Sequence, residues 1–339
     1  RKTMAMEIKL PPVVFGTSGL GNLFVALDEE VKFRIVEACV RLSGRQVVFD
    51  TAGKYGAGLS LEVLGRSLRR LGVAPEDVMI SNKLGWLRSP LLTEEPTFEP
   101  GVWKDLKHDA VQKIGYDGIL ECFEQGNELL GGYTPQMVSV HDPDEYLAAA
   151  GEDGGLINSR YEDILDAYDA LFDLKREGRV SAVGVGAKDW RVIQRIVKDV
   201  PLDWVMFANS MTLKSHPGEL KDLIQELAGK GVAIINSAVF HSGFLVGSDY
   251  FDYRKLERGH AGNEPLFRWR EKFFAVCDEF GIKPAAACVQ FALRVPGVGS
   301  IALHSSNPAR VKENLEMAAG ELPEAFWRAL RERGLIGII

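Results

Sequence analysis

The sequence of 339 residues has little cysteine and little histidine, and neither residue type is spaced to bind a metal ion. The four cysteines are scattered and form no C-x-x-C pair; they are Cys39, Cys122, Cys277 and Cys288. We therefore expect free thiols in a reducing cytoplasm rather than a disulfide framework. The six histidines are also dispersed, without a His-x-His pair, so we expect no metal centre.

The chain also lacks long hydrophobic runs and an excess of positive charge. No stretch reaches the roughly 18 apolar residues of a membrane span, and the basic start at residues 1–6 has no apolar segment behind it, so we expect no signal peptide. Lys and Arg number 40 against 47 Asp and Glu, which gives a net charge of −7. Because phosphate backbones bind to clustered Lys and Arg, this balance argues against a nucleic acid partner.

Short apolar runs alternate with helical patterns along the whole chain. The runs are Val13–Phe15, Val47–Phe49, Val78–Ser81, Met137–Val140, Ala182–Val185, Trp204–Phe207, Val232–Ile235 and Ser300–Leu303. Runs that are apolar at every position are typical of strands buried on both faces. Apolar residues recur at helical spacing in Glu30–Ser43, Leu61–Leu71, Tyr116–Leu130, Tyr161–Arg176, Trp190–Val197, Gly218–Ala228 and Pro308–Ala319. This alternation predicts an α/β protein, a (β/α)8 TIM barrel that forms one domain over residues 1–339.

Two connections are long and rich in aromatic residues. They follow the third and seventh strands, at residues 83–141 and 237–265. Both leave the carboxyl ends of strands, where barrel enzymes place their sites, and long loops inside a compact domain are usually functional. We expect them to shape a substrate pocket or lid, with Trp86 as the candidate pocket residue.

Polar residues stand at the ends of three consecutive strands. Asp50 and Tyr55 follow the second strand, Lys83 ends the third and His141 ends the fourth. Taken singly, each has an ordinary structural explanation as a turn, cap or solvated residue. Taken together, a lysine cation favours the phenolate of Tyr55 and a carboxylate fixes that lysine, while an imidazole orients a substrate oxygen. This set suits proton transfer during the interconversion of a carbonyl and an alcohol.

The residues around the tyrosine and the strand ends resemble a known family, the aldo-keto reductases. The similar segments are Asp50-Thr51-Ala52, Tyr55-Gly56, Ser60–Gly65, Asn82-Lys83 and His141–Asp144, and the last is similar to the aldose dehydrogenase branch. The resemblance extends from Gly16 to about Ala319. It implies a (β/α)8 barrel that binds NADP or NAD without a Rossmann domain, with Asp50, Tyr55, Lys83 and His141 as the catalytic set.

The same resemblance implies the cofactor contacts. The candidate residues at the corresponding positions are Gly16, Thr17, Ser18, Asn209, Ser237, Ser242, Gly243, His304, Ser305, Arg310 and Asn314, of which Ser237 replaces a tyrosine that is common in the family. Arg310 lies near the start of an expected helix, where a positive side chain and the helix N-terminus both favour an anion. His304 stands where a lysine or arginine is common in the family, so the choice between NADP and NAD stays open.

These observations predict an NAD(P)-dependent oxidoreductase that interconverts an alcohol or sugar hemiacetal with a carbonyl or lactone. Tyr55 would be its general acid or base, and its partner a small molecule. Two alternatives stay open. One is a Schiff-base aldolase with Lys83 as the amine nucleophile. The other is a regulatory protein that binds the cofactor but turns over little.

Overall fold

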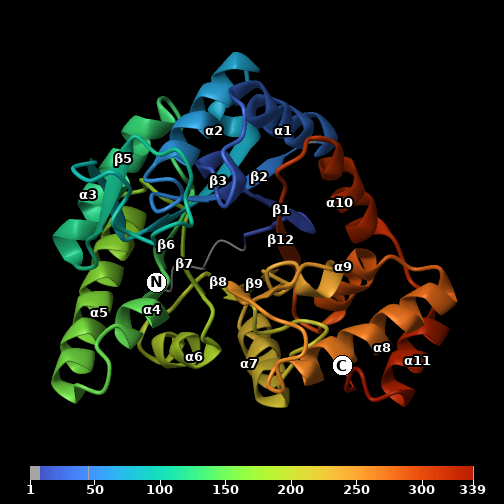
Figure 1. Ribbon diagram of the computed structural model, residues 1–339. Helices are drawn as coiled ribbons and strands as arrows, with labels where there is room; N and C mark the ends of the chain where they lie inside the picture. Colours follow the sequence, from blue (N-terminus) through green and yellow to red (C-terminus); the bar gives the residue numbers. More distant parts are fainter. Residues whose placement is uncertain (1–7, 45, 339) are drawn as a thin grey trace.

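Eight parallel strands form a closed barrel at the centre of the protein (Figure 1). This computed structural model describes residues 8–44 and 46–338. The barrel strands are β1 (Val13–Gly16), β2 (Val47–Ala52), β3 (Val78–Leu84), β6 (Met137–His141), β7 (Ala182–Ala187), β8 (Trp204–Ala208), β9 (Ala233–Ser237) and β12 (Ser300–His304). Their order around the barrel is β1-β12-β9-β8-β7-β6-β3-β2, and β1 pairs with both β12 and β2 to close it. The predicted (β/α)8 barrel is therefore confirmed.

Each barrel strand continues one to three residues beyond the apolar run that predicted it. β2 includes Asp50, β3 includes Lys83 and β6 includes His141. The backbone ladder continues there because it needs only N–H and C=O groups, whereas the side chains at the barrel mouth are free to be polar. The three polar residues are therefore held by regular, paired backbone.

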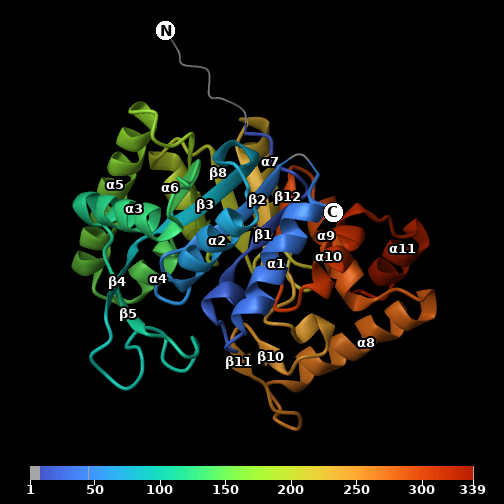
Figure 2. The ribbon, with the colours of Figure 1, turned by 90° about the horizontal axis from the view of Figure 1, so that it is seen from above.

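Helices surround the barrel and cover the outer faces of its strands (Figures 1 and 2). They are α1 (Glu29–Leu42), α2 (Leu59–Arg70), α3 (Tyr116–Leu130), α4 (Pro143–Ala148), α5 (Gly154–Arg176), α6 (Trp190–Asp199), α7 (Gly218–Gly229), α8 (Glu264–Phe280), α9 (Pro284–Arg294), α10 (Ala309–Ala319) and α11 (Glu324–Glu332). Short 3-10 turns lie at η1 (Ser18–Gly21), η2 (Pro75–Asp77) and η3 (Phe244–Val246). No helix among the described residues has an apolar stretch long enough to cross a membrane.

The two long connections contain antiparallel hairpins that the apolar pattern did not reveal. β4 (Trp86–Pro90) pairs with β5 (His108–Gln112), and β10 (Tyr250–Phe251) pairs with β11 (Arg254–Lys255). Both hairpins project from the same end of the barrel (Figure 2). That end carries the carboxyl termini of the strands, as expected for loops that follow β3 and β9.

The opposite end of the barrel is filled by apolar side chains. Met137, Ala182 and Trp204, which begin β6, β7 and β8, form a buried cluster with Met206 and Ile235. Larger clusters fill the space between the strands and the surrounding helices, and all four cysteines are free thiols buried in the protein. The apolar cluster and the polar residues Asp50, Lys83 and His141 therefore lie at opposite ends of the barrel.

Candidate active site

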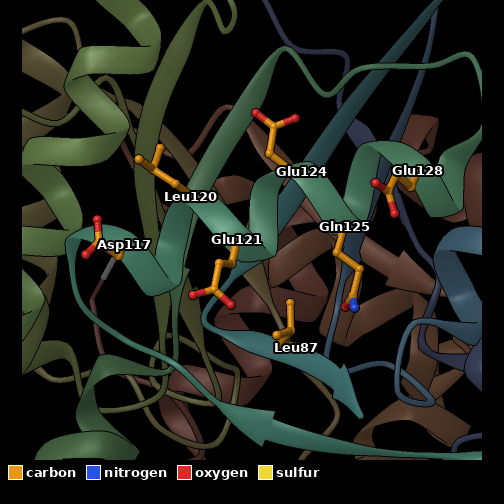
Figure 3. A pocket seen from close by; sticks show the side chains of 7 residues that line it. All are labelled: Leu87, Asp117, Leu120, Glu121, Glu124, Gln125 and Glu128. Carbon is orange, nitrogen blue, oxygen red and sulfur yellow. The ribbon is translucent and has the colours of Figure 1, made fainter. Parts of the chain in front are cut away.

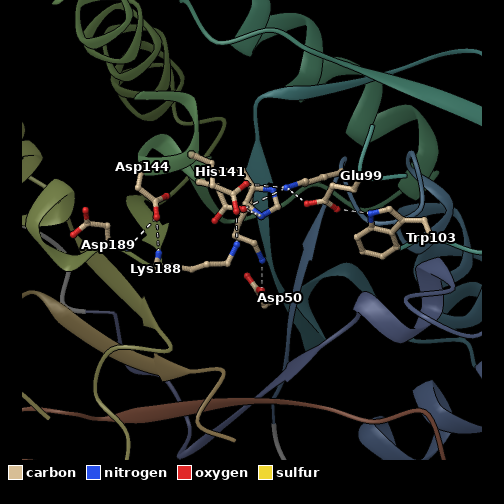
Figure 4. Close-up of polar contacts among 11 residues, drawn as sticks. Asp50, Glu99, Trp103, His141, Asp144, Lys188 and Asp189 are labelled. Carbon is tan, nitrogen blue, oxygen red and sulfur yellow. Dashed lines mark hydrogen bonds and ion pairs between the residues drawn. The ribbon is translucent and has the colours of Figure 1, made fainter. Parts of the chain in front are cut away.

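Four polar side chains meet at the carboxyl end of three neighbouring strands. In β2, the Asp50 carboxylate accepts hydrogen bonds from the Lys83 ammonium of β3 and, at 3.1 Å, from the Ser81 hydroxyl. The Lys83 Nζ lies 4.6 Å from the centroid of the Tyr55 ring. The His141 ring of β6 meets that phenol ring edge-on, with centroids 5.7 Å apart. The structure thus brings together the four residues predicted from the strand ends; Asp50 and His141 appear in Figure 4.

The backbone around Tyr55 is held against the loop after β1. Gly56 has a φ of 64°, and a Cβ added there would lie 2.5 Å from the Gly21 carbonyl oxygen. A Cβ on Gly21 would lie 2.7 Å from the Tyr55 carbonyl carbon. Only glycine fits at both positions. The glycine-rich segment after β1 is therefore a close-fitting support for the turn that carries Tyr55.

Burial and charge set the protonation of the four groups. Burial opposes the charge on Lys83, but Asp50 and then Tyr55 raise its pKa above the ordinary value. Burial lowers the pKa of His141 well below its ordinary value, and the positive charges of Lys83 and Lys54 lower it further. The site therefore holds a charged lysine and a neutral histidine at neutral pH.

The pKa of Tyr55 corrects one expectation. Its pKa is raised, because burial disfavours the phenolate more than Lys83 favours it. Lys83 does act in the expected direction, since its charge and its hydrogen bond both lower the pKa, while the Asp50 charge raises it. Tyr55 is therefore a protonated phenol at neutral pH, with a cation beside it that stabilises the conjugate base.

Charged and aromatic side chains lie around the Tyr55 phenol; we call this group, made of Lys54, Trp86, Glu99, Trp103 and Glu145, the frame. The sequence did not predict most of it. Lys54, next to Tyr55 in the chain, forms ion pairs with Glu99 and Glu145. The Trp103 ring lies 5.7 Å from the Tyr55 ring, centroid to centroid. The sequence could not predict that Trp103 contacts Tyr55, because this contact depends on the path of the long loop between β4 and β5. The position of Lys54 beside the tyrosine was the one available signal.

Trp86, the predicted pocket residue, packs against the same apolar cluster as Tyr55. It begins β4 and packs on Phe98, with ring centroids 5.7 Å apart. The Lys54 Nζ lies 5.4 Å from its ring, and its indole N–H is buried without a hydrogen-bond partner among the described residues. Trp86 thus belongs to the frame, while Trp103 makes the contact with Tyr55.

The predicted cofactor residues at the end of β1 and directly after it lie beside Asp50. Gly16 ends β1 and is paired in register with Asp50. The Thr17 hydroxyl donates to the Asp50 carbonyl oxygen at 2.9 Å, and the Ser60 hydroxyl donates to the Thr17 carbonyl at the same distance. Ser18 begins the short turn η1. These residues therefore form one wall of the site.

Further predicted cofactor residues follow β8 and β9. Asn209 has a φ of 58° and donates its N–H to the Ser237 carbonyl at 3.2 Å. The Ser237 hydroxyl donates to the Phe207 carbonyl at 3.1 Å. In the loop that follows, Ser242 and Gly243 have φ angles of 58° and 86°, and the Ser242 hydroxyl accepts the N–H of Tyr253. The loop is bent back on itself.

His241 holds this loop in place. Its Nε2 lies 2.7 Å from the Thr212 hydroxyl, in the loop after β8, and its Nδ1 lies 2.7 Å from the Asp252 carboxylate, in the β10–β11 hairpin. The imidazole also stacks on Phe251, with ring centroids 4.6 Å apart. The loops after β8 and β9 are therefore fixed to each other through one buried side chain.

The last predicted cofactor residues lie at the end of β12 and in α10. His304 ends β12 and is exposed to solvent. The Ser305 hydroxyl donates to the Asn307 carbonyl at 2.6 Å, and the Asn307 side chain accepts the N–H of Ala309. Ser305 and Asn307 thus form the turn that starts α10, in which Arg310 and Asn314 lie.

A surface pocket of about 510 Å³ lies outside this site, between α3 and β4 (Figure 3). Its lining residues are Leu87, Asp117, Leu120, Glu121, Glu124, Gln125 and Glu128. Two of the carboxylates are already paired, Glu121 with Lys113 and Glu124 with Arg179. None of the four strand-end residues lines this pocket, so it is separate from the candidate active site.

Comparison with known proteins identifies the family. The model of the aldo/keto reductase family matches residues 12–333. The chain belongs to this family. As a member of it, the protein is an NAD(P)-dependent oxidoreductase.

Two curated relatives span nearly the whole of this aldo/keto reductase. A D-threo-aldose 1-dehydrogenase from a Pseudomonas species is 29% identical, over 98% of this chain and 96% of the relative. Pyridoxal 4-dehydrogenase from Microbacterium luteolum is 27% identical, over 95% and 93%. The family resemblance found in the sequence is therefore confirmed.

Solved structures have the same fold at lower identity. Glycerol dehydrogenase from Gluconobacter oxydans superposes with a TM-score of 0.68 and 17% identity, over 99% of this chain and 96% of that one. An aldo-keto reductase from Bacillus halodurans, in its holo form, gives a TM-score of 0.67 and 19% identity, over 95% and 91%. These likenesses confirm the barrel of this aldo/keto reductase.

The residues at the start of α10 fit the nicotinamide cofactor that the family uses. Arg310 lies in the first turn of this helix, and that turn contains no acidic residue. A cation at a helix N-terminus is unfavourable alone, because it adds to the positive end of the helix dipole. The arrangement therefore suits an anion such as a cofactor phosphate.

Proposed function

We propose that this aldo/keto reductase interconverts an alcohol or sugar hemiacetal with a carbonyl or lactone, with Tyr55 as the general acid or base. One observation carries the proposal. The Tyr55 ring contacts both the Lys83 ammonium and the His141 imidazole, and Lys83 is held by Asp50. A phenol flanked in this way can give a proton to a developing alkoxide, or take one from a hydroxyl group.

Each side chain has a separate task in this proposal. Asp50 keeps Lys83 charged and in place. The Lys83 cation stabilises the phenolate that forms when Tyr55 gives up its proton, which is an electrostatic contribution made only as charge develops. The neutral His141 orients the substrate oxygen toward the phenol by a hydrogen bond. A bound nicotinamide cofactor would supply or accept the hydride.

We propose an aldose as the most suitable substrate class. The curated relatives are named for dehydrogenation of an aldose and of pyridoxal. The Tyr55 ring packs on Trp103. Both rings lie beside a cluster of charged groups that includes Glu99, Asp142 and Lys188. A sugar has apolar C–H faces that pack on aromatic rings and hydroxyl groups that bond to charged side chains.

The proposed cofactor contacts lie at the ends of β1, β9 and β12, in the loops that follow these strands and β8, and in α10. They are Gly16, Thr17, Ser18, Asn209, Ser237, Ser242, Gly243, His304, Ser305, Arg310 and Asn314. Arg310 would bind a phosphate of NADP, whereas the imidazole of His304 is a weaker phosphate partner than a lysine or arginine would be. Both NADP and NAD therefore belong in the test. The four buried thiols support a reducing cytoplasm as the location.

The charge on Lys83 argues against a Schiff-base aldolase. An amine nucleophile must be neutral, and aldolase-type lysines have lowered pKa values. The pKa of Lys83 is instead raised, because Asp50 lies in contact with its ammonium group. Borohydride trapping with substrate should therefore leave no covalent adduct on Lys83.

The experiment is a substrate and cofactor panel. Aldoses, simple alcohols and aldehydes are each mixed with the oxidised or reduced form of NADP and NAD, and hydride transfer is followed by absorbance. We expect turnover with aldoses to exceed turnover with simple alcohols, and the product to be a lactone. Cofactor binding without turnover of any substrate would contradict the proposal and would support a regulatory role instead.

A further inference from the structure

A buried lysine to which the proposed chemistry gives no contact with the substrate lies directly beside the catalytic turn. Lys54 precedes Tyr55 and is only 3% exposed. Its ammonium group forms ion pairs with Glu99 at 2.6 Å, Glu145 at 3.2 Å and Asp142 at 3.6 Å. Burial opposes the charge, but these carboxylates raise the pKa of Lys54 above its ordinary value. A charge is costly to bury, so it persists only where partners surround it.

The three carboxylates come from three different parts of the chain. Glu99 lies between β4 and β5, Asp142 follows β6 directly, and Glu145 lies in α4. Glu99 and Asp142 both have left-handed backbone, with φ angles of 42° and 46°. Such conformations cost free energy for residues other than glycine and persist when their surroundings enforce them. Lys54 is thus the point where separate segments are joined.

From Glu99 the connection continues to the phenol. The Glu99 carboxylate binds Lys54 through Oε1 and accepts the indole N–H of Trp103 through Oε2, at 2.6 Å (Figure 4). Trp103 is 7% exposed, and its ring packs against the Tyr55 ring. A chain of contacts therefore runs from Lys54 through Glu99 and Trp103 to Tyr55. Its two ends, Lys54 and Tyr55, are adjacent in the sequence.

The loop between β4 and β5, residues 91–107, is also attached to the loop after β1 by backbone hydrogen bonds. Phe24 donates its N–H to the Val102 carbonyl at 2.8 Å, and Lys104 donates its N–H to the Asn22 carbonyl at 3.0 Å. These bonds hold residues 102–104 against the loop after β1. On the side of the catalytic turn, Lys54–Glu99 is the ion pair that holds the loop. Its loss would release Glu99, the residue that accepts the Trp103 indole N–H.

We propose that Lys54 is a positioning residue that fastens residues 91–107 over Tyr55, and so fixes the Trp103 ring as a wall of the substrate site. The predicted change in KM rests on the proposed function, whereas the predicted attachment of the loop does not. Lys54 is enclosed by carboxylates and acts through Glu99 and Trp103 rather than on the substrate. The ion pair between Asp50 and Lys83 is separate from it. Loss of Lys54 should therefore weaken substrate binding and leave proton transfer largely intact.

The test compares Lys54→Met, Glu99→Gln and their double variant with the wild type. Lys107→Met is the matched control, because Lys107 is an exposed lysine of the same segment. Glu99→Gln keeps an oxygen for the Trp103 indole and leaves Lys54 with two carboxylates, so it guards against a folding failure of Lys54→Met. The measurements are kcat and KM for the best aldose, cofactor affinity by fluorescence titration, and thermolysin cleavage within residues 91–107.

We expect Lys54→Met to raise KM at least about tenfold with kcat within about threefold of wild type, the signature of lost binding. The double variant should be no worse than Lys54→Met, because both changes break one connection. Cleavage of residues 91–107 should be faster in both single variants, while cofactor affinity and Lys107→Met stay at wild-type values.

Wild-type KM and wild-type loop cleavage in Lys54→Met and Glu99→Gln would overturn the inference. So would a fall in kcat as large as the rise in KM, since that would place Lys54 in the proton-transfer step. A wild-type protein that turns over no substrate would instead overturn the proposed function. In that case the cleavage measurement alone still decides whether Lys54 fastens the loop.

Discussion

Lys83 is in contact with both a carboxylate and a phenol, and it is almost fully buried. The Asp50 carboxylate binds its ammonium group, and the Tyr55 ring lies 4.6 Å away. Removal of one member of a buried ion pair leaves the other as an uncompensated charge, whereas removal of both does not. The two charges are therefore coupled in stability.

The buried pair predicts the outcome of a double-mutant cycle. Lys83→Met should lower the free energy of unfolding by about 3–5 kcal/mol, because the Asp50 carboxylate loses its cation. Lys83→Met combined with Asp50→Asn should lose clearly less than the sum of the single changes. Urea unfolding of the four proteins measures this, and additive losses would show that the two charges are independent.

His141 predicts a pH dependence of stability. Its pKa in the folded protein lies well below 6.5, so below about pH 6.5 the unfolded chain binds a proton that the folded chain does not. Stability is therefore present above that pH and is lost as pH falls, by about 1.4 kcal/mol for each pH unit. His141→Asn should remove this part of the loss between pH 7 and 5.5. The exposed-site control His260→Asn should keep the full wild-type slope, and equal slopes in both variants would contradict the prediction.

The four central residues were predictable from the sequence because each belongs to, or closely follows, a short strand whose carboxyl end is fixed by the fold. Asp50, Lys83 and His141 needed only strand positions to be placed together. The contact between Glu99 and Lys54 was not predictable, since it depends on how a long loop returns to the barrel. The net pKa of Tyr55 was also misjudged, because the cost of burial is known only once the structure is known.

Among the elements, α2 and α3 approach each other closely and cover the outer faces of β2 and β3. Gly65 of α2 makes this possible, because a Cβ there would lie 1.9 Å from the Leu130 carbonyl oxygen. The helices follow the strands that carry Asp50 and Lys83. Their spacing thus influences where those strands sit.

Gly65→Ala should lower the free energy of unfolding by about 1–3 kcal/mol, because the added methyl group forces the two helices apart. Gly229→Ala is the control, since Gly229 is exposed at the end of α7 and an added Cβ meets nothing within 4 Å. It should be neutral or stabilising by up to about 1 kcal/mol. Equal effects in urea unfolding would show that helix contact at Gly65 is unimportant.

Elements with strong periodicity were predicted well, and those with mixed composition were not. Most predicted helices end within two residues of the observed bounds. The exception is α5, which begins at Gly154, seven residues before the predicted Tyr161. Two glycines and several polar residues hide its first turns, although Asp153 caps them by accepting the N–H of Leu156. α4, α8, α9, α11 and the two hairpins were missed.

At the scale of the whole molecule, the barrel closes through pairing of distant segments. β1 pairs with β2 on one side and with β12, near the other end of the chain, on the other. A barrel with a missing strand would expose unpaired backbone and the apolar interior. This supports the proposal that residues 1–339 form one domain.

One domain should unfold in one cooperative step. We expect thermal unfolding followed by far-UV circular dichroism and by tryptophan fluorescence to give the same midpoint within about 2 °C. The six tryptophans report on different parts of the chain, from β4 to α11. Two separated transitions would contradict a single domain.

The most direct test of the account is hydride transfer by Tyr55→Phe in a single turnover with saturating cofactor. The change removes only the phenol oxygen, and the ring contacts with Trp103 and His141 are kept. We predict a loss of at least about 100-fold in the rate of hydride transfer, with unchanged cofactor affinity. A rate near that of the wild type would show that Tyr55 is not the proton donor and would end the proposed mechanism.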